Sequence, residues 1–201
     1  MTHPTRITLI RHGETIWNRE RRMQGSQDIP LSDTGLEQAE AVAKRLAADG
    51  TTYHHIYSSH LRRAHQTAAT IAAALNLPHT VHEDLRERSF GDLEGHTRDQ
   101  ILDKYPDFFG PGPKPPIPGL ETFEQVSARA HRVIHDLIQN HTDEHILIVS
   151  HGGTINAFLH AISDGAYGTG VNKLGTTSLT HVIHEKDKTW HIKKVGCTEH
   201  L

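Results

Sequence analysis

The chain has 201 residues, with 21 Lys and Arg against 24 Asp and Glu and a formal net charge of −3. This balance argues against a general nucleic-acid binder, which would carry a basic excess, and a charged fraction of 22% argues against a disordered chain. No apolar run is long enough to cross a bilayer, and the single cysteine, Cys197, cannot form a disulfide within the chain. We therefore expect a cytoplasmic protein of one domain, residues 1–201, with neither nucleic acid nor a membrane as partner.

The first half of the chain predicts strands that alternate with helices. Residues 7–10 are apolar and mostly β-branched, as is typical of a buried strand. Thr34 and Glu37 have the spacing of a capping box, and apolar residues at helical intervals continue to about Asp49. The next expected elements are a strand at 55–59, an Ala-rich helix at 61–75 and a strand at 79–83.

The second half continues this pattern and closes on a hairpin. Residues 122–140 carry an amphipathic stripe that predicts a long helix, and 146–149 have the strongest strand pattern in the chain. A helix is expected to follow as far as about Ile162. Residues 179–184 and 190–194 alternate apolar with polar side chains, which indicates antiparallel edge strands. The order predicts an α/β three-layer sandwich with a mostly parallel central sheet and helices on both faces.

One stretch interrupts the alternation. Residues 110–119 are rich in proline and glycine and can form neither a helix nor a central strand, because each proline lacks an N–H donor and fixes φ. The segment from about 96 to 121 is therefore expected to be a lid or rim beside a functional site, with a plain connector as the alternative.

Two histidines follow predicted strands directly, and each is followed by glycine. Arg11-His12-Gly13 comes after the first strand, and Ser150-His151-Gly152-Gly153 comes after the strongest one. Ligands of open α/β sheets bind beyond the carboxyl ends of the strands, where glycine lets an anion approach the backbone and arginine supplies a charged fork. Either histidine alone would more simply be structural, since the chain has 19 histidines. Together they favour a phosphate site, to which Arg63 could add a second guanidinium.

These residues resemble the histidine phosphatase superfamily, in the branch that contains cofactor-dependent phosphoglycerate mutases and broad-specificity phosphatases. The resemblance covers nearly the whole chain and implies a phosphoglycerate mutase-like fold. The stretches that carry it, in the family's order, are 9–18, 22–25, 28–32, 57–68, 85–95 and 149–153.

The resemblance implies a role for each matching residue. His12 would be the nucleophile that forms a phosphohistidine, and Glu87 would protonate the leaving alcohol and then activate water. Arg11, Arg63 and His151 would line the phosphate pocket, with Arg63 preferred to its neighbour Arg62 because it directly precedes the alanine of its motif. The other residues expected to bind phosphate or substrate are Gly13, Asn18, Gln24, Gly25 and Gly152.

The same resemblance implies that no metal is required, because arginine and histidine meet the phosphate charge. His131 and His135 are four residues apart on one predicted helix and could form a metal pair, but no further ligand follows by spacing, so both are expected to be surface residues. A metal-dependent hydrolase is the corresponding alternative. A non-catalytic binder of phosphorylated ligands is a further one, against which the presence of both His12 and Glu87 argues.

The identity of the phosphoryl acceptor separates a phosphatase from a mutase. The resemblance implies that mutases of the family are longer, with an insertion after the Glu-bearing motif that brings extra arginines. In this chain, residues 99–124 contain only Lys104 and Lys114 as cations. A phosphatase acting on a small phosphorylated metabolite is therefore predicted, with no cofactor. The alternative is a phosphoglycerate mutase dependent on 2,3-bisphosphoglycerate. The natural substrate is not predicted, and a homodimer is left open.

Overall fold

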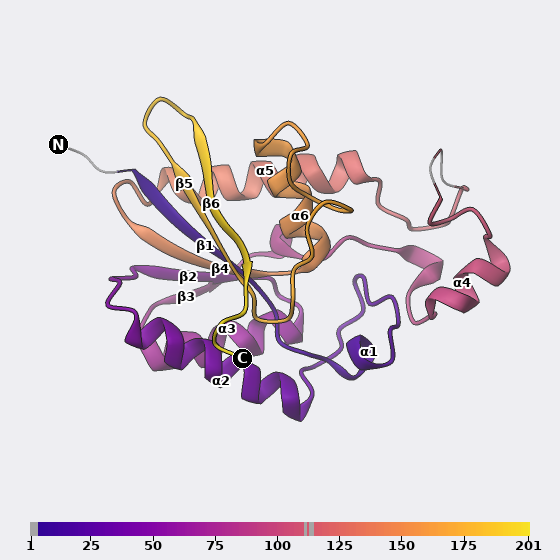
Figure 1. Cartoon of the computed structure of the whole chain (residues 1–201), viewed down its shortest axis with the longest axis horizontal. Coiled ribbons are helices and arrows are strands. Elements are labelled where there is room, and N and C mark those ends of the chain that lie inside the picture. Colours follow the sequence, from indigo (N-terminus) through magenta and orange to yellow (C-terminus); the bar gives the residue numbers. More distant parts are fainter. Residues whose placement is uncertain (1–3, 111, 113–114) are drawn as a thin grey trace.

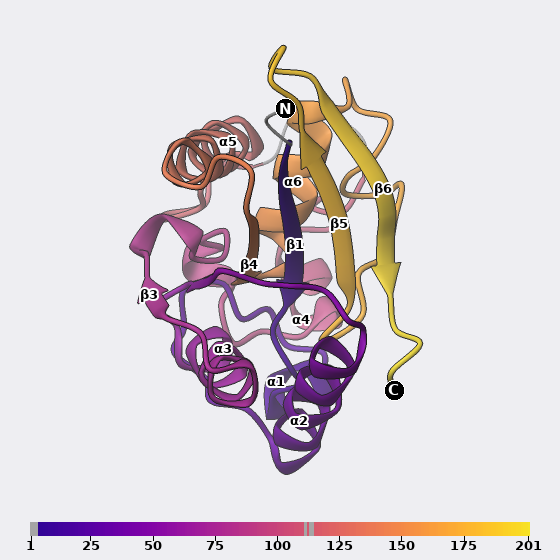
Figure 2. The same ribbon diagram turned by 90° about the vertical axis from the view of Figure 1, so that its left-hand side faces the viewer.

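The computed structural model describes residues 4–110, 112 and 115–201, and within these residues six strands form one mixed sheet. The order across the sheet is β3-β2-β4-β1-β5-β6, in which β3, β2, β4 and β1 run parallel and β5 and β6 run antiparallel to their neighbours. The strands are β1 (Thr5–Arg11), β2 (His55–Ser58), β3 (His79–Val81), β4 (His145–Ser150), β5 (Leu179–His184) and β6 (Trp190–Cys197). The predicted fold class, including the antiparallel hairpin at one edge, is confirmed (Figure 2).

Helices cover both faces of this sheet. Figure 1 shows α5 and α6 above the strands and α2 and α3 below them. The helices are α1 (Ile16–Arg19), α2 (Asp33–Ala48), α3 (Arg62–Leu75), α4 (Arg98–Lys104), α5 (Phe123–Gln139) and α6 (Gly152–Ile162). Within the described residues, no helix is both long and apolar enough to span a membrane.

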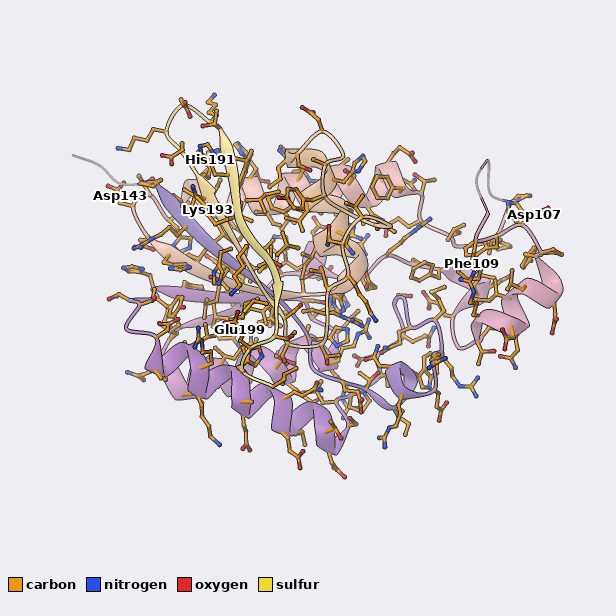
Figure 3. All side chains as sticks on the ribbon, viewed as in Figure 1. Asp107, Phe109, Asp143, His191, Lys193 and Glu199 are labelled. Atoms are coloured by element: carbon orange, nitrogen blue, oxygen red, sulfur yellow. The ribbon has the colours of Figure 1, made fainter. Side chains whose placement is uncertain are left out.

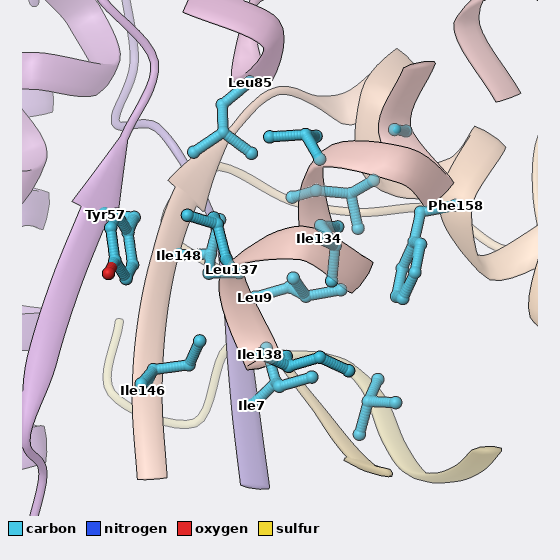
Figure 4. Packing of buried hydrophobic residues seen from close by; sticks show 14 of the residues in the cluster. Ile7, Leu9, Tyr57, Leu85, Ile134, Leu137, Ile138, Ile146, Ile148 and Phe158 are labelled. Atoms are coloured by element: carbon cyan, nitrogen blue, oxygen red, sulfur yellow. The ribbon is translucent and has the colours of Figure 1, made fainter. Parts of the chain in front are cut away.

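Two hydrophobic clusters bury the two faces of the sheet. Successive side chains of a strand point to opposite faces, so Ile7 and Leu9 pack toward α5 and α6, while Ile10 packs toward α2 and α3. Figure 4 shows the first cluster, in which Leu9 and Ile148 lie close to Leu137 and Ile134 of α5. Burial of each such aliphatic side chain stabilises the fold by about 1.5–3 kcal/mol. Residues at the carboxyl ends of β1 and β4 are therefore held in fixed positions by the packed sheet.

The local details differ from prediction in two places. Helix α2 is capped by Ser32, whose Oγ accepts from the N–H of Gly35, so the expected capping box at Thr34 is wrong. The reason is tertiary: the Ser32 N–H donates to the Glu14 carbonyl, which holds Ser32 at the cap and leaves Thr34 in the first turn. The third strand is shorter than predicted because Glu83–Leu85 form a 3₁₀ turn.

The segment 96–121 contains structure that the sequence analysis did not predict. Helix α4 begins at Thr97, which forms a capping box with Gln100, and a separate small cluster forms around it from Leu93, Ile101, Phe108 and Ile117. Figure 3 shows Phe109 and Asp107 here, at the far side of the molecule from Lys193 on β6. Pro111, Pro113 and Lys114 lie outside the described residues, and the role of the segment as a lid remains a prediction.

Candidate active site

The ends of β1 and β4 bring the two predicted histidines together. The strands are neighbours with Arg11 opposite Ser150, so the next residues, His12 and His151, emerge side by side. Their ring centroids are 5.1 Å apart, and the side chains are 3% and 0% exposed. The first pair of residues singled out by the sequence therefore forms one buried site.

Hydrogen bonds select the tautomer of each ring. His12 Nδ1 lies 2.7 Å from the Gly13 carbonyl oxygen and must donate to it, which leaves the Nε2 lone pair of the neutral ring unprotonated. His151 Nδ1 accepts from Arg63 Nε at 3.2 Å, so the proton of the neutral ring is on Nε2. One histidine can thus act as a nucleophile and the other as a hydrogen-bond donor.

The electrostatic surroundings keep both rings neutral. Burial, and after it the positive charges of Arg63 and Arg11, hold the pKa of His12 well below its ordinary value. Burial and the Arg63 charge do the same to the pKa of His151. A neutral imidazole has a lone pair to offer a phosphorus atom, so the site needs no base to activate His12.

Arg63 is a buried guanidinium at the centre of the site. It is 0% exposed, and its Nη1 and Nη2 donate to the carbonyls of Gln27 and Gly25 at 2.6 and 2.7 Å. Burial lowers the pKa of Arg63 to about 10, so the group stays charged at neutral pH. Its neighbour Arg62 is exposed, and its backbone N–H donates to Asp28. The structure places Arg63, and not Arg62, against the two histidines.

Two buried donors in this region have unused hydrogen-bonding capacity. In the part of the chain that the structure describes, Arg11 Nε and His151 Nε2 are buried without a partner, while Arg11 Nη1 donates to the Leu174 carbonyl at 2.7 Å. Buried N–H groups nearly always find acceptors, so these two donors are available to an anionic ligand.

Glu87 lies at the N-terminus of α6, where its carboxylate accepts from the backbone. The N–H groups of Gly153 and Thr154 each donate to it at 3.0 Å. A Cβ on Gly153 would lie 2.5 Å from Glu87 Oε1, so the absence of a side chain there is what lets the carboxylate approach. Glu87 thereby shares one cavity with His12 and Arg63.

The remaining predicted residues divide into two groups. Arg11, Asn18, Gln24, Gly25 and Gly152 line the same cavity as His12, whereas His151 lies beside the His12 ring and is not part of the lining. The N–H of Gly13 instead donates to Thr67 Oγ1 at 3.1 Å, so in this structure it is already paired and does not face the cavity. The close approach of the backbone carbonyl of Gly35, 2.6 Å from where a Cβ would lie, explains why position 13 holds glycine.

The cavity over His12 has a volume of about 420 Å³ and includes residues that the sequence analysis missed. Their shared feature is a position on loops or on the outer turn of α6, away from the strand ends. Arg22, Met23 and Phe90 lie within stretches that carry the family resemblance, without a role assigned to them there, and Asn156, Thr169, Gly170, Asn172, Lys173 and Leu174 lie outside those stretches. Asn156 could have been found, since it lies one helical turn beyond Gly152 on α6. Nothing in the sequence marks Lys173.

Metal ligands are not assembled in the described residues, among which no group of three or more His, Cys, Asp or Glu side chains could hold a metal ion. His131 and His135 stack with ring centroids 6.0 Å apart on α5, remote from the cavity lining. The positive groups that face the cavity are side chains of arginine and lysine.

Comparison with known proteins places this chain in a family. A family model described as "Histidine phosphatase superfamily (branch 1)" matches residues 7–198. The chain is 33% identical to the phosphatase PhoE of Bacillus subtilis, covering 98% of this chain and 97% of that one. It is 34% identical to a metal-independent phosphoserine phosphatase of Arabidopsis thaliana, covering 98% and 83%.

Comparison with solved structures supports the same family assignment. YhfR of Bacillus stearothermophilus is 34% identical and superposes with a TM-score of 0.88 over 98% of both chains. Other relatives are named as probable phosphoglycerate mutases, so similarity extends to both activities of the branch. The chain belongs to the histidine phosphatase superfamily, branch 1.

Proposed function

We propose that this protein is a metal-independent phosphomonoesterase that works through a phosphohistidine on His12. The observation that supports this best is the neutral His12 ring, whose Nδ1 donates to the Gly13 carbonyl and whose pKa is lowered by burial and then by the charges of Arg63 and Arg11. Membership of the family, with relatives named as phosphatases, supports the same activity.

In the first step, His12 Nε2 attacks phosphorus and the bond from phosphorus to the leaving oxygen breaks. Charge builds on the equatorial oxygens of the transferring group, where Arg11 Nε, Arg63 and His151 Nε2 can stabilise it. Glu87 gives its proton to the leaving alkoxide, a contribution of about 10²- to 10⁴-fold in rate.

In the second step, water replaces the alcohol. Glu87, now a carboxylate, takes a proton from water as the oxygen attacks phosphorus and the bond to His12 Nε2 breaks. Inorganic phosphate leaves, and the neutral imidazole and the protonated Glu87 are restored. No metal is needed in this scheme, because side chains of the protein neutralise the charge of the phosphoryl group.

The outer part of the cavity supports a substrate class. Lys173 brings positive charge to the lining, and so does Arg22, although its guanidinium also pairs with Glu20 and donates to the Gly95 carbonyl. Asn156 adds an amide, and Met23 and Phe90 add apolar surface. We propose a small phosphomonoester whose alcohol carries a carboxylate, of the kind that the phosphoserine phosphatase of Arabidopsis thaliana acts on. Arg22 and Lys173 both lie outside residues 99–124, the stretch whose lack of arginine favoured a phosphatase over a mutase in the sequence.

The acid role of Glu87 can be tested by varying the leaving group. Glu87→Gln should lower kcat/KM for an alkyl ester such as β-glycerol phosphate by roughly 10²-fold or more, and that for p-nitrophenyl phosphate far less, because nitrophenolate leaves without a proton and kcat/KM does not include the later attack of water. Equal losses on both substrates would remove the general-acid role.

The mutase remains the second candidate, because relatives of this chain are named as phosphoglycerate mutases and the cations at the mouth could hold phosphoglycerate. A phosphatase screen run beside a mutase assay, with and without 2,3-bisphosphoglycerate, separates the two. Strong mutase activity that depends on this cofactor would overturn the phosphatase proposal.

A further inference from the structure

The segment that carries Glu87 is neither an α-helix nor a β-strand, yet each of its four backbone carbonyls accepts a hydrogen bond from a side chain. Asp84 and Leu85 belong to the 3₁₀ turn Glu83–Leu85, and Arg86 and Glu87 continue from it without regular structure. An irregular segment of this kind would keep many conformations unless side chains satisfied its backbone groups. The position of the Glu87 carboxylate therefore depends on the groups that hold residues 84–87, together with the N–H groups of Gly153, Thr154 and Arg88 that donate to the carboxylate directly.

Arg129 of α5 supplies most of that hold. Its Nη1 donates to the carbonyls of Asp84 and Arg86 at 2.8 and 3.0 Å, and its Nη2 reaches the carbonyl of Glu87 at 3.5 Å. The remaining carbonyl, that of Leu85, accepts from Ser150 Oγ at 2.8 Å, and the Arg86 carbonyl also accepts from Thr154 Oγ1 at 2.6 Å. Arg129 is only 4% exposed, so these contacts are made away from water.

Glu121 fixes the guanidinium of Arg129 in turn. Nε and Nη2 of Arg129 donate to the two carboxylate oxygens of Glu121, both at 2.9 Å, in a bidentate pair. Burial alone would raise the pKa of Glu121, but the hydrogen bonds and charge of Arg129 outweigh it and hold that pKa below its ordinary value. Glu121 is therefore charged, and the pair is a fixed unit.

The same carboxylate holds the other side of the Glu87 segment. Glu121 Oε2 accepts from the N–H of Ser89 at 3.2 Å, and the Glu121 N–H donates to the Ser89 carbonyl at 3.0 Å. Arg88 Nε donates to the Glu121 carbonyl at 2.8 Å. The pair of Arg129 and Glu121 thus contacts residues on both sides of Glu87 without itself lining the cavity.

We infer that Arg129, locked by Glu121, is the positioning residue for the general acid: it sets where the Glu87 carboxylate stands against the leaving oxygen. This inference rests on the proposed acid role of Glu87. A guanidinium is suited to the task because its donors form a rigid fork that can serve several carbonyls and a carboxylate at once. Lysine has one donor atom and cannot make this set of bonds.

The test is Arg129→Lys, assayed on two substrates. The kcat/KM for β-glycerol phosphate should fall by roughly 10- to 100-fold, and that for p-nitrophenyl phosphate by less than about threefold, because only the former needs a proton from Glu87 when the leaving group departs. The comparison uses kcat/KM because kcat also includes the later step in which Glu87 activates water for both substrates. The inhibition constant of inorganic phosphate should not change, since Arg63 and the two histidines are untouched. Activity on the nitrophenyl ester also reports that the variant is folded.

Arg132→Gln provides the matched control. Arg132 lies on the same helix and meets the same segment, but only through the Asp84 carboxylate at 3.4 Å, with its side chain 62% exposed. Both substrates should be hydrolysed within about twofold of the parent rates, because an exposed ion pair contributes little. If Arg129→Lys does not fold, Glu121→Gln keeps the size of the side chain, removes its charge, and should show the same selectivity with a smaller loss.

Equal losses on both substrates in a folded variant, or no loss on either, would overturn the positioning role. Glu87→Gln is measured alongside to separate the two claims. If Glu87→Gln is selective for the alkyl ester and neither Arg129→Lys nor Glu121→Gln is, only the positioning role fails. If Glu87→Gln slows both substrates equally, the acid role fails and the positioning role fails with it.

Discussion

The two ends of the cavity are built in different ways. At the phosphate end, His12, His151 and Arg63 are at most 3% exposed, and they stand at the ends of β1 and β4 and on the first turn of α3. At the mouth, Arg22 and Lys173 come from irregular segments, and Lys173 is exposed. Strand ends and a helix hold the buried histidines and Arg63, whereas loops hold the residues at the mouth, and we propose that these loops select the alcohol.

The first test of this difference removes the charge of Arg63 from the buried end of the cavity. Arg63→Met should lower kcat/KM by roughly 10²- to 10³-fold on every phosphomonoester, because it deletes a fixed charge that faces the transferring group. It also removes the donors that hold Gly25 and Gln27. Steady-state kinetics on an alkyl and an aryl substrate measure the effect.

The neighbouring arginine gives the control for that change. Arg62→Met alters an exposed side chain one residue away and should leave kcat/KM within about twofold, as is usual for surface substitutions. Similar losses in the two variants would contradict the distinction between a buried catalytic arginine and an exposed neighbour.

The second test sharpens the comparison at the mouth. Lys173→Met should lower kcat/KM for phosphoserine by roughly three- to tenfold, as expected for loss of one partly solvated charge pair, and leave p-nitrophenyl phosphate unchanged. Lys193→Met on β6, which does not line the cavity, serves as the control; Figure 3 labels this residue. A loss of the same size on both substrates would place Lys173 with the phosphate end instead.

The third test separates burial from catalysis, because His145 is buried but lies outside the cavity. Burial, with the charge of Arg6 second, lowers the pKa of His145 to about 4, and the ordinary value for the unfolded chain is about 6.5. Between these values the unfolded chain binds more protons, so stability should fall as pH drops from 6.5 toward 4. The expected loss from His145 is on the order of 3 kcal/mol.

Denaturant unfolding at pH 7 and at pH 4.5 measures this loss, and His145→Gln should reduce the difference between the two. His65→Gln, at an exposed position of α3, should not. A free energy of unfolding that is the same at both pH values would contradict the assignment of His145 as a buried neutral group.

How well the sequence predicts a site residue also depends on whether that residue lies at a strand end or on a loop. Residues beside strand ends could be predicted, because a short apolar run and a following Arg-His-Gly are adjacent in sequence and stay adjacent in space. Arg63 needed the resemblance, since helical spacing alone does not choose between positions 62 and 63. Helix α4 could have been predicted from the capping-box spacing of Thr97 and Gln100, but the proline-rich stretch that follows favoured a loop for the whole segment.

The residues that could not be predicted act over long sequence distances. Lys173 reaches the cavity only because the loop between α6 and β5 passes over the strand ends, and Arg129 serves Glu87 from 42 positions away. The cap of α2 at Ser32 is likewise set by a contact with Glu14. Tertiary contacts of this kind leave no periodic or local trace in a single sequence.

The most direct measurement of the central claim is to trap the covalent intermediate. Brief reaction with a phosphomonoester labelled on phosphorus, followed by denaturation, should leave phosphate on the protein that is labile to acid and stable to alkali. Peptide mapping should place the label on His12. The His12→Ala variant should carry no label, and a cooperative unfolding transition should show that this variant is folded. Label that persists in folded His12→Ala, or that maps to His151, would contradict the account.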